Sequence, residues 1–334
     1  MKHRYLTFYL VITAFFGSVG QGLALPACSE TKPELWHFCI GTVVDNGDKF
    51  YGTFINNKKN GLGEYTWKNG DTFSGIYKND KKNGAGKYSY ANGETFEGNF
   101  WNGMAHGEGV YTYLDGSKFL GKYQEGKRSG SGKMIFADGA FFEGYYLNGA
   151  RTGFGLARFS NGDKYSGHWS DNKRVGQGIY TWENGDIYAG YWEEGKKSGH
   201  GNFSYINGSY FFGNFENGLA NGWGFSVTKD NYVTLCEYAF GDTKQCTNPE
   251  TGEEFSVLEN RFEAHSEIDR KNIQEKLTDI GFYQEDIDGL WGRDSFAAIL
   301  KYASLEFESI ALHEPLFANQ ILSSLLGLNL RNKN

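Results

Sequence analysis

A 23-residue period is the feature that most limits how this chain can fold. An Asn-Gly or Asp-Gly pair recurs every 23 residues from Asn46-Gly47 to Asn207-Gly208, without insertion. Two further tracks keep the same phase: G-x-G pairs from Gly61/Gly63 to Gly222/Gly224, and a lone glycine from Gly52 to Gly213. Three tracks in phase over eight periods identify an array of structural repeats. We therefore expect the chain to stack copies of one small unit.

Within each period the apolar residues alternate with a period of two, which indicates β-strands. In "GLGEYTWKNGDTFSGIY", alternate residues form an aromatic face before and after the Asn-Gly pair, and polar residues oppose them. Asn-Gly between such strands favours a type I′ turn. The other link, "KNDKKNG", is longer and polar, so we expect it to be a solvent-exposed loop to the next hairpin. The fixed glycines leave room for a ring to lie over the backbone. The predicted aromatic face includes Tyr65, Trp67, Phe73, Tyr77, Trp169, Trp182, Tyr188 and Trp192.

Composition agrees with a folded, non-collagenous chain. The 334 residues include 47 Gly and are 17% aromatic and 22% charged, which is far too aromatic for a disordered segment. A formal net charge of −7 argues against nucleic acid as the main partner, because no concentrated basic face is offered to phosphates.

The first residues predict export. Residues 1–24, "MKHRYLTFYLVITAFFGSVGQGLA", place Lys2 and Arg4 before a short apolar run and small residues, as in a signal peptide cleaved after Ala24. The apolar run is shorter than the roughly 20 residues that span a bilayer. A less favoured alternative is lipidation at Cys28, because "LPAC" resembles a lipoprotein cleavage box. We expect a periplasmic or extracellular location.

Four cysteines fit an oxidising compartment. Cys28 and Cys39 flank one short segment (residues 25–40, a predicted N-terminal cap), and Cys236 and Cys246 flank another. Two local disulfides are the simplest of the three pairings. No C-x-x-C spacing favours a metal site, and no cofactor is expected.

The repeats resemble a known family. The pattern in "DIYAGYWEEGKKSGHGNFSYINGS" is similar to the MORN (membrane occupation and recognition nexus) repeat, over residues 41–241. Ala157 and Cys236 depart from the pattern, and the latter suggests an end cap pinned by a disulfide. The resemblance implies a mainly β protein: an elongated, single-layer antiparallel β-meander of about eight hairpins. It also implies protein–protein scaffolding or contact with membrane lipids.

Basic pairs occupy the same link of five repeats. If these links lie along one edge of the sheet, they form a basic stripe toward an anionic glycan, wall polymer or lipid surface. The plainer interpretation is that the charges only protect sheet edges. The pairs are Lys58 and Lys59, Lys81 and Lys82, Lys127 and Arg128, Lys173 and Arg174, and Lys196 and Lys197.

Beyond residue 241 glycine becomes sparse. We expect a linker over 242–260 and a helical domain over 261–334, with one helix bearing Ile273, Leu277 and Ile280 and ending at Gly281, and a second capped by Asp294 or Ser295. The terminal "LFANQILSSLLGLNL" is apolar enough to pack internally or to form a homodimer.

This segment is similar to the peptidoglycan-binding-like domain of bacterial envelope proteins, through Ile273-Gln274, "GFY", "IDGLWG" and Tyr302. The resemblance implies peptidoglycan contact, although turns and packing explain the same residues. The candidate contact residues are Tyr283, Asp288, Gly289, Trp291 and Arg293.

No nucleophile or metal motif stands out, so we expect no enzyme activity. The sequence predicts an exported envelope scaffold whose array binds an unknown protein partner and whose helical domain binds peptidoglycan. The alternatives are an anionic lipid-surface binder and a targeting subunit for a separate wall enzyme.

Overall fold

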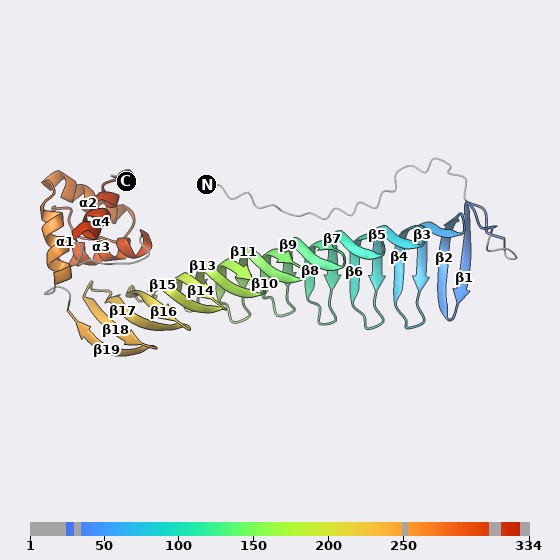
Figure 1. Ribbon diagram of the computed structural model, residues 1–334, viewed down its shortest axis with the longest axis horizontal. Coiled ribbons are helices and arrows are strands. Elements are labelled where there is room, and N and C mark those ends of the chain that lie inside the picture. Colours follow the sequence, from blue (N-terminus) through green and yellow to red (C-terminus); the bar gives the residue numbers. More distant parts are fainter. Residues whose placement is uncertain (1–24, 30–34, 249–252, 307–314, 328–334) are drawn as a thin grey trace. The chain divides into compact units, whose positions relative to one another are not determined.

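The computed structural model describes residues 25–29, 35–248, 253–306 and 315–327 (Figure 1). The chain divides into two compact units, Met1–Ala91 with Phe100–Gly103, and Asn92–Asn99 with Met104–Asn334. The described residues hold nineteen strands followed by four helices. The predicted signal peptide, residues 1–24, lies outside the described part of the chain.

The strands are seven to nine residues long in the repeats, which fits the alternating pattern that predicts them. Their bounds are β1 Cys39–Asp45, β2 Asp48–Ile55, β3 Lys58–Thr66, β4 Thr72–Lys78, β5 Lys81–Ser89, β6 Thr95–Trp101, β7 Met104–Thr112, β8 Lys118–Gln124, β9 Lys127–Ile135, β10 Phe141–Leu147, β11 Ala150–Arg158, β12 Lys164–Ser170, β13 Lys173–Thr181, β14 Ile187–Glu193, β15 Lys196–Ser204, β16 Tyr210–Glu216, β17 Leu219–Val227, β18 Val233–Ala239 and β19 Asp242–Thr247.

These strands form one open antiparallel sheet. Every described register joins strands that follow one another in the sequence. The predicted meander is therefore confirmed. The eight predicted hairpins, each built on an Asn-Gly or Asp-Gly pair, account for β1 to β16, and β17, β18 and β19 follow them in the sheet.

The two kinds of link are the reverse of what the sequence predicts. The expected long loop is a two-residue turn: Asn79 and Asp80 both have positive φ, at 49° and 69°, and β5 begins at Lys81. Positive φ at both central residues is the type I′ requirement. All nine equivalent pairs at this spacing, from Asn56-Asn57 to Phe240-Gly241, have positive φ at both residues.

The periodic Asn-Gly pair instead ends a wider turn. In the turn between β3 and β4, Gly70 is the residue with positive φ, at 93°. Its N–H donates to the Trp67 carbonyl. The Asn69 side chain accepts from the Asp71 N–H at 3.0 Å, which holds the turn without a left-handed asparagine. The type I′ prediction at Asn-Gly is correct only for Asn46-Gly47.

The role predicted for the strand glycines is confirmed. Gly63 and Gly75 face each other across β3 and β4, and Gly75 faces Gly86 across β4 and β5. The ring of Phe73 lies over the last two of these, so a Cβ on Gly75 would come within 2.6 Å of the ring. Each ring thus packs flat on backbone that only glycine leaves bare.

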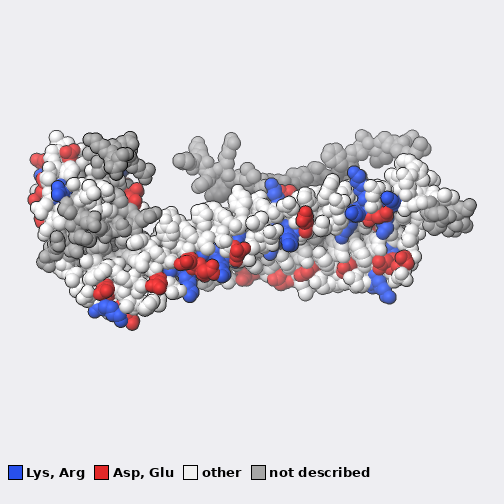
Figure 2. All heavy atoms as spheres, in the orientation of Figure 1, with Lys and Arg blue, Asp and Glu red and all other residues white. Residues whose placement is uncertain are grey.

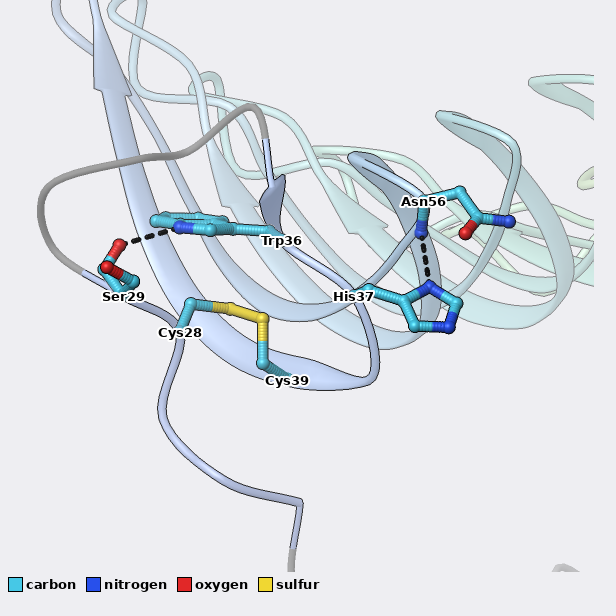
Figure 3. Close-up of a disulfide and its surroundings, with 6 residues drawn as sticks. All are labelled: Cys28, Ser29, Trp36, His37, Cys39 and Asn56. Atoms are coloured by element: carbon cyan, nitrogen blue, oxygen red, sulfur yellow. Dashed lines mark hydrogen bonds between the residues drawn. A yellow bond between two sulfur atoms is a disulfide. The ribbon is translucent and has the colours of Figure 1, made fainter.

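Disulfides secure both terminal hairpins, as predicted. Cys28 bonds to Cys39 in β1, so its sulfur is not available for the lipid thioether considered above. Beside this bond, the buried Trp36 donates its indole N–H to the Ser29 carbonyl at 2.7 Å, and the Asn56 N–H donates to His37 Nδ1 at 3.2 Å (Figure 3). Cys236 of β18 bonds to Cys246 of β19, its partner in register.

Four helices follow: α1 Glu253–Glu263, α2 Glu267–Asp279, α3 Arg293–Glu306 and α4 Pro315–Leu325. The linker expected over 242–260 is wrong, because β19 and the start of α1 fill most of it. Ile273 and Leu277 are fully buried as predicted, but Ile280 is the exposed C-cap. Helix α3 begins at Arg293, so Ser295 is a buried helical residue and not its cap.

The helices share a core with the outer face of the last repeats. Tyr210, Phe212, Phe225 and Val227 belong to the same buried cluster as Leu258, Phe262 and the α3 residues. Asn231 donates to Asp294 at 2.9 Å, and Asn202 to Ser304 at 3.1 Å. Ala318, Ile321 and Leu322 of α4 are fully buried in this core, so that helix is a packing helix.

Candidate binding face of the repeat array

Aromatic rings from alternate strand positions line one face of the sheet, which we call the inner face. Tyr165 contacts Trp169 and Trp192 edge to face, with ring centroids 5.3 and 5.4 Å apart. Tyr188 continues the row to Trp192 and to Phe215 at 5.1 Å. Phe73 and Tyr77 are paired in the same way at 5.4 Å. These rings are buried against one another, and edge-to-face packing gives the row a fixed geometry.

A second row of rings runs beside the wide turns and is half-exposed. Tyr65 stacks beside Trp67 at 4.4 Å, and Trp67 beside Tyr88 at 5.1 Å. In the later repeats Trp182 and Phe203 form the same contact at 4.8 Å. All eight aromatic residues predicted for this face therefore lie on it, and each takes part in one of these ring contacts. The half-exposed row offers ring surface to a ligand.

Acidic residues at the wide turns bind the tyrosines of this row. The Tyr65 hydroxyl donates to Asp48 at 2.8 Å, and Asp48 also accepts from the Lys68 N–H at 2.9 Å. The backbone bond, followed by the tyrosine bond, lowers the pKa of Asp48. Burial, followed by this carboxylate, raises the pKa of Tyr65 to about 12. Tyr88 with Asp71, Tyr111 with Glu94 and Tyr180 with Asp163 repeat the pair, so in these repeats a carboxylate ties one repeat to the next.

The basic pairs divide between two environments, which corrects the predicted stripe of loop cations. Both members begin a strand. The first residue of each pair is exposed: Lys58, Lys81, Lys127, Lys173 and Lys196. The second residue of each pair is half-buried on the inner face: Lys59, Lys82, Arg128, Arg174 and Lys197. Figure 2 shows acidic and basic side chains interspersed along the visible face of the array.

The half-buried cations lie over the rings. Lys59 Nζ is 4.4 Å from the Tyr65 centroid, and the Arg174 guanidinium is 4.1 Å from the Trp192 centroid. Burial lowers the pKa of Lys59 and of Arg174. Such contacts are worth roughly 0.5–2 kcal/mol each, depending on desolvation. Each cation therefore fills a cradle formed by the rings of its own repeat and the next.

Sequence inspection for basic pairs missed one member of this row. Arg151 follows Ala150, so no pair marks it, yet its guanidinium is 4.3 Å from the Trp169 centroid. The 23-residue register was the available signal, because Arg151 stands midway between Arg128 and Arg174. The same register places Ala105 and Ala220 at the two positions without a cation.

The residues proposed for peptidoglycan contact surround a buried glutamine. Gln274 is fully buried and donates to Tyr283 and Asp288, each at 3.2 Å, and it accepts from the Gly289 N–H at 2.7 Å. The Asp288 carboxylate also accepts from the Leu290 N–H, and these bonds lower its pKa. These side chains hold the turn between α2 and α3.

The other two candidates make packing contacts. Trp291 lies among Phe255, Phe262 and Phe296, with centroids 5.3, 5.2 and 6.0 Å away. The Arg293 guanidinium lies 4.3 Å from the Tyr232 centroid on the sheet. All five candidates are thus engaged within the fold: three at the turn after α2, Trp291 in the helical core, and Arg293 against Tyr232. A separate hollow of about 420 Å³ between α2 and α4 is lined by polar residues, among them His265, Asn272 and Glu275.

Neither a metal-binding cluster nor a helix able to span a membrane occurs among the described residues. No group of His, Cys, Asp or Glu in the described part of the chain is arranged to hold a metal ion. Among the described helices, none is both long enough and apolar enough to cross a membrane.

Comparison with known proteins identifies the repeats. Seven consecutive segments match the MORN repeat: residues 50–72, 73–95, 96–118, 119–141, 142–164, 165–187 and 188–210. The matched segments end at residue 210 and do not reach the helical domain. No curated protein matches the sequence.

Two solved structures have low similarity to this chain in sequence and in fold. The TCP domain of SAS-4 from Drosophila melanogaster, in complex with a proline-rich motif, is 12% identical with a TM-score of 0.31, and the match covers 57% of this chain and 96% of that one. The TCP10 domain of Danio rerio CPAP is 13% identical with a TM-score of 0.24, over 62% of this chain and 99% of that one.

Proposed function

Because residues 50–210 consist of MORN repeats, we propose that this chain is a non-catalytic scaffold whose inner face binds a partner protein. The observation that carries the proposal is the half-exposed ring row from Tyr65 and Trp67 onward, backed by buried rings and half-buried cations. Aromatic surface held rigidly at low entropic cost is what protein interfaces favour. The helices lie against the outer face of the last repeats and leave this row uncovered there.

Photo-crosslinking tests the scaffold. A photoreactive phenylalanine analogue replaces Trp67 on the inner face in one variant, and Leu62, which is 72% exposed on the outer face, in a control. We expect a discrete adduct from position 67 and none, or a different one, from position 62. Identical adduct patterns from both positions, or none from 67 in the protein's own cells, would refute partner binding by the inner face.

We further propose that the protein is exported and that its helical domain binds peptidoglycan. The two disulfides support an oxidising compartment. The support for wall binding is the sequence resemblance over Ile273 to Tyr302, together with the polar hollow between α2 and α4. The hollow is a better candidate for ligand contact than the five residues predicted from the sequence, because those five already bond or pack within the fold.

Co-sedimentation with purified peptidoglycan sacculi tests wall binding. The full chain is compared with Glu275→Lys, inside the hollow, and with Glu285→Lys, an exposed residue outside it that makes the same charge change. We expect the first variant alone to pellet several-fold less. Failure of the unaltered chain to pellet excludes wall binding, and equal pelleting of all three excludes the hollow. Pelleting with anionic vesicles instead, collapsing as salt rises, would favour the lipid-surface alternative.

A further inference from the structure

The cation row of the inner face lacks a cation at two of its eight positions, and a hollow adjoins one of them. Six of the eight equivalent positions hold Lys or Arg over rings, and Ala105 and Ala220 hold none. Next to Ala220 lies a hollow of about 460 Å³ on the inner face. In the described repeats the chain therefore fills six cradles with its own side chains and leaves the one at Ala220 open.

Three of the four rings of a filled cradle have counterparts at the open one; the fourth, Phe203, corresponds to Ser226. Lys197 Nζ lies 5.9, 5.5 and 4.9 Å from the centroids of Trp182, Tyr188 and Phe215. The residues 23 positions later are Tyr205, Phe211 and Tyr238, and all three line the hollow. The electron-rich faces of aromatic rings attract cations. Lys197 borders the hollow from the preceding repeat, and the cation that position 220 would supply is absent.

The details favour a guanidinium over an ammonium. An aspartate stands eleven residues before each cradle lysine (Asp48, Asp71 and Asp186) and also before Arg174 (Asp163), whereas Ser117 and Ala140 stand before Arg128 and Arg151. Ser209 stands at this position before Ala220 and lines the hollow. The cradles of this chain that lack the carboxylate hold arginine.

A hydrogen-bond acceptor is also in place. The Arg151 guanidinium donates to the Asn172 carbonyl at 3.0 Å, and that of Arg174 to the Gly195 carbonyl at 2.7 Å, each 21 residues further along the chain. The corresponding residue for position 220 is Gly241, which lines the hollow. The neighbouring charge of Lys197 does not forbid a cation, since Arg128, Arg151, Arg174 and Lys197 already occupy four consecutive repeats.

We propose that the hollow at Ala220 binds an arginine side chain of a partner protein. This assignment rests on the proposed scaffold function and names the chemistry of the partner. The bound guanidinium lies over the rings of Phe211 and Tyr238, which contact each other at 5.3 Å, and donates to the Gly241 carbonyl, as the internal arginines do in their cradles.

The test titrates the full chain with acetyl-Gly-Arg-Gly-amide and follows the ring signals of ¹³C-labelled tyrosine by NMR. The signals of Tyr205 and Tyr238 are assigned with Tyr→Phe variants. We expect both to shift with the arginine peptide, and the matching citrulline peptide, neutral but of the same shape, to bind about tenfold more weakly or not at all. Equal binding of the citrulline peptide would overturn the proposal.

Two substitutions give an internal control. Ala220→Arg supplies the missing cation and is expected to abolish peptide binding while keeping or raising the thermal midpoint, because it copies positions 128, 151 and 174. Ala220→Ser leaves the hollow open and should bind as before. Undiminished binding by Ala220→Arg would refute the site.

Arg174→Ala provides the converse experiment. It empties the cradle of Tyr165, Tyr180 and Trp192. We expect a second arginine-peptide site that shifts the Tyr165 and Tyr180 signals. If Trp67 crosslinks a partner but no arginine peptide binds, the scaffold stands and the arginine assignment fails. If arginine binds at Ala220 and nothing crosslinks, the site stands and the scaffold fails.

Discussion

The ring of Phe73 covers Gly86 on the neighbouring strand so closely that a Cβ on Gly86 would lie 2.4 Å from Phe73 Cζ. The same relationship joins Phe119 to Gly132 and Tyr188 to Gly201, where the Cβ would also lie 2.4 Å from the ring. Each ring is buried by its two glycines on one side and by rings of the adjoining strands on the other. The glycine track and the aromatic track are therefore one packing device.

Gly86→Ala is expected to destabilise the array by about 1–3 kcal/mol, the usual cost of overpacking a core. The backbone and the buried ring of Phe73 have nowhere to move without disturbing the next repeat. Gly292→Ala is the control, because its Cβ meets no atom within 4 Å and its φ is not positive. Urea unfolding followed by tryptophan fluorescence measures both. A midpoint for Gly86→Ala as high as that of the control would contradict the packing role.

The carboxylates of the wide turns predict a loss of stability in acid. The bonds from Lys68 N–H and Tyr65 lower the pKa of Asp48 in the folded protein, so its contribution is present above the unfolded-chain value near 4 and is lost as the pH falls through the lower folded value. Asp71 and Glu94 add contributions of the same sign, each through a bond from a tyrosine as the first cause.

Asp48→Asn should therefore lower the unfolding midpoint at pH 7, and the difference from the unaltered chain should shrink below about pH 4. Tyr65→Phe removes only one of the two bonds and should give a smaller change of the same kind. Thermal unfolding at a series of pH values provides the measurement. A difference that is constant from pH 7 to pH 3 would show that the charge of Asp48 is irrelevant.

Adjacent cations in one pair should differ in their effect on stability. Arg174→Met removes the charge over Trp192 and the bond to the Gly195 carbonyl, and we expect a loss of about 1–2 kcal/mol. Lys173 is exposed and pairs with Glu194 at the surface, so Lys173→Met should cost under about 1 kcal/mol. Urea denaturation of the two variants makes the comparison, and equal losses would disprove the division of each pair into an inward and an outward member.

Removal of the helices should expose an apolar surface on the last repeats. A chain ending at residue 252 leaves Tyr210, Phe212, Phe225 and Val227 without their helical cover. We expect this fragment to self-associate and to melt at a lower temperature than the full chain. Light scattering after size-exclusion chromatography detects the association. Phe212→Ser with Phe225→Ser in the same fragment should restore a monomer, and a monomeric unaltered fragment would mean that the joint contributes little.

The repeat was readable from the sequence because period and alternation are strictly local. One stretch of eleven residues, which contains Gly63, Tyr65 and Phe73, predicts the strands, the face on which each residue lies and its packing. The turn types were assigned wrongly because Asn-Gly is common to both kinds of link here: Asn102-Gly103 forms the tight turn and Asn69-Gly70 ends the wide one. Backbone bonds close the wide turn, from the Gly70 N–H to the Trp67 carbonyl and from the Trp67 N–H to the Asp71 carbonyl, and the Asn-Gly pair alone does not predict them.

The joint between helices and sheet was missed because its signal is a departure from the repeat. Outer-face positions that hold Ser74, Glu97 or Glu143 in earlier repeats hold Phe212 in the last, and Lys87 or Lys133 becomes Phe225. Read against the earlier repeats, that change from polar to apolar marks where another element must lie. The role of Arg293 over Tyr232 depends on the joint itself, and no local pattern predicts it.

Each disulfide involves an edge strand of the sheet: Cys39 belongs to β1, and Cys246 to β19. An open sheet is most easily extended at its edges, where unpaired backbone groups accept a further strand from another molecule. The Cys236–Cys246 bond closes the β18–β19 hairpin, and the Cys28–Cys39 bond ties the segment before β1 to that strand, so each edge is held in one conformation. Thiol reductants would release the ends while leaving the interior repeats unchanged, and end-to-end polymerisation would then begin at the two strands that oxidation keeps closed.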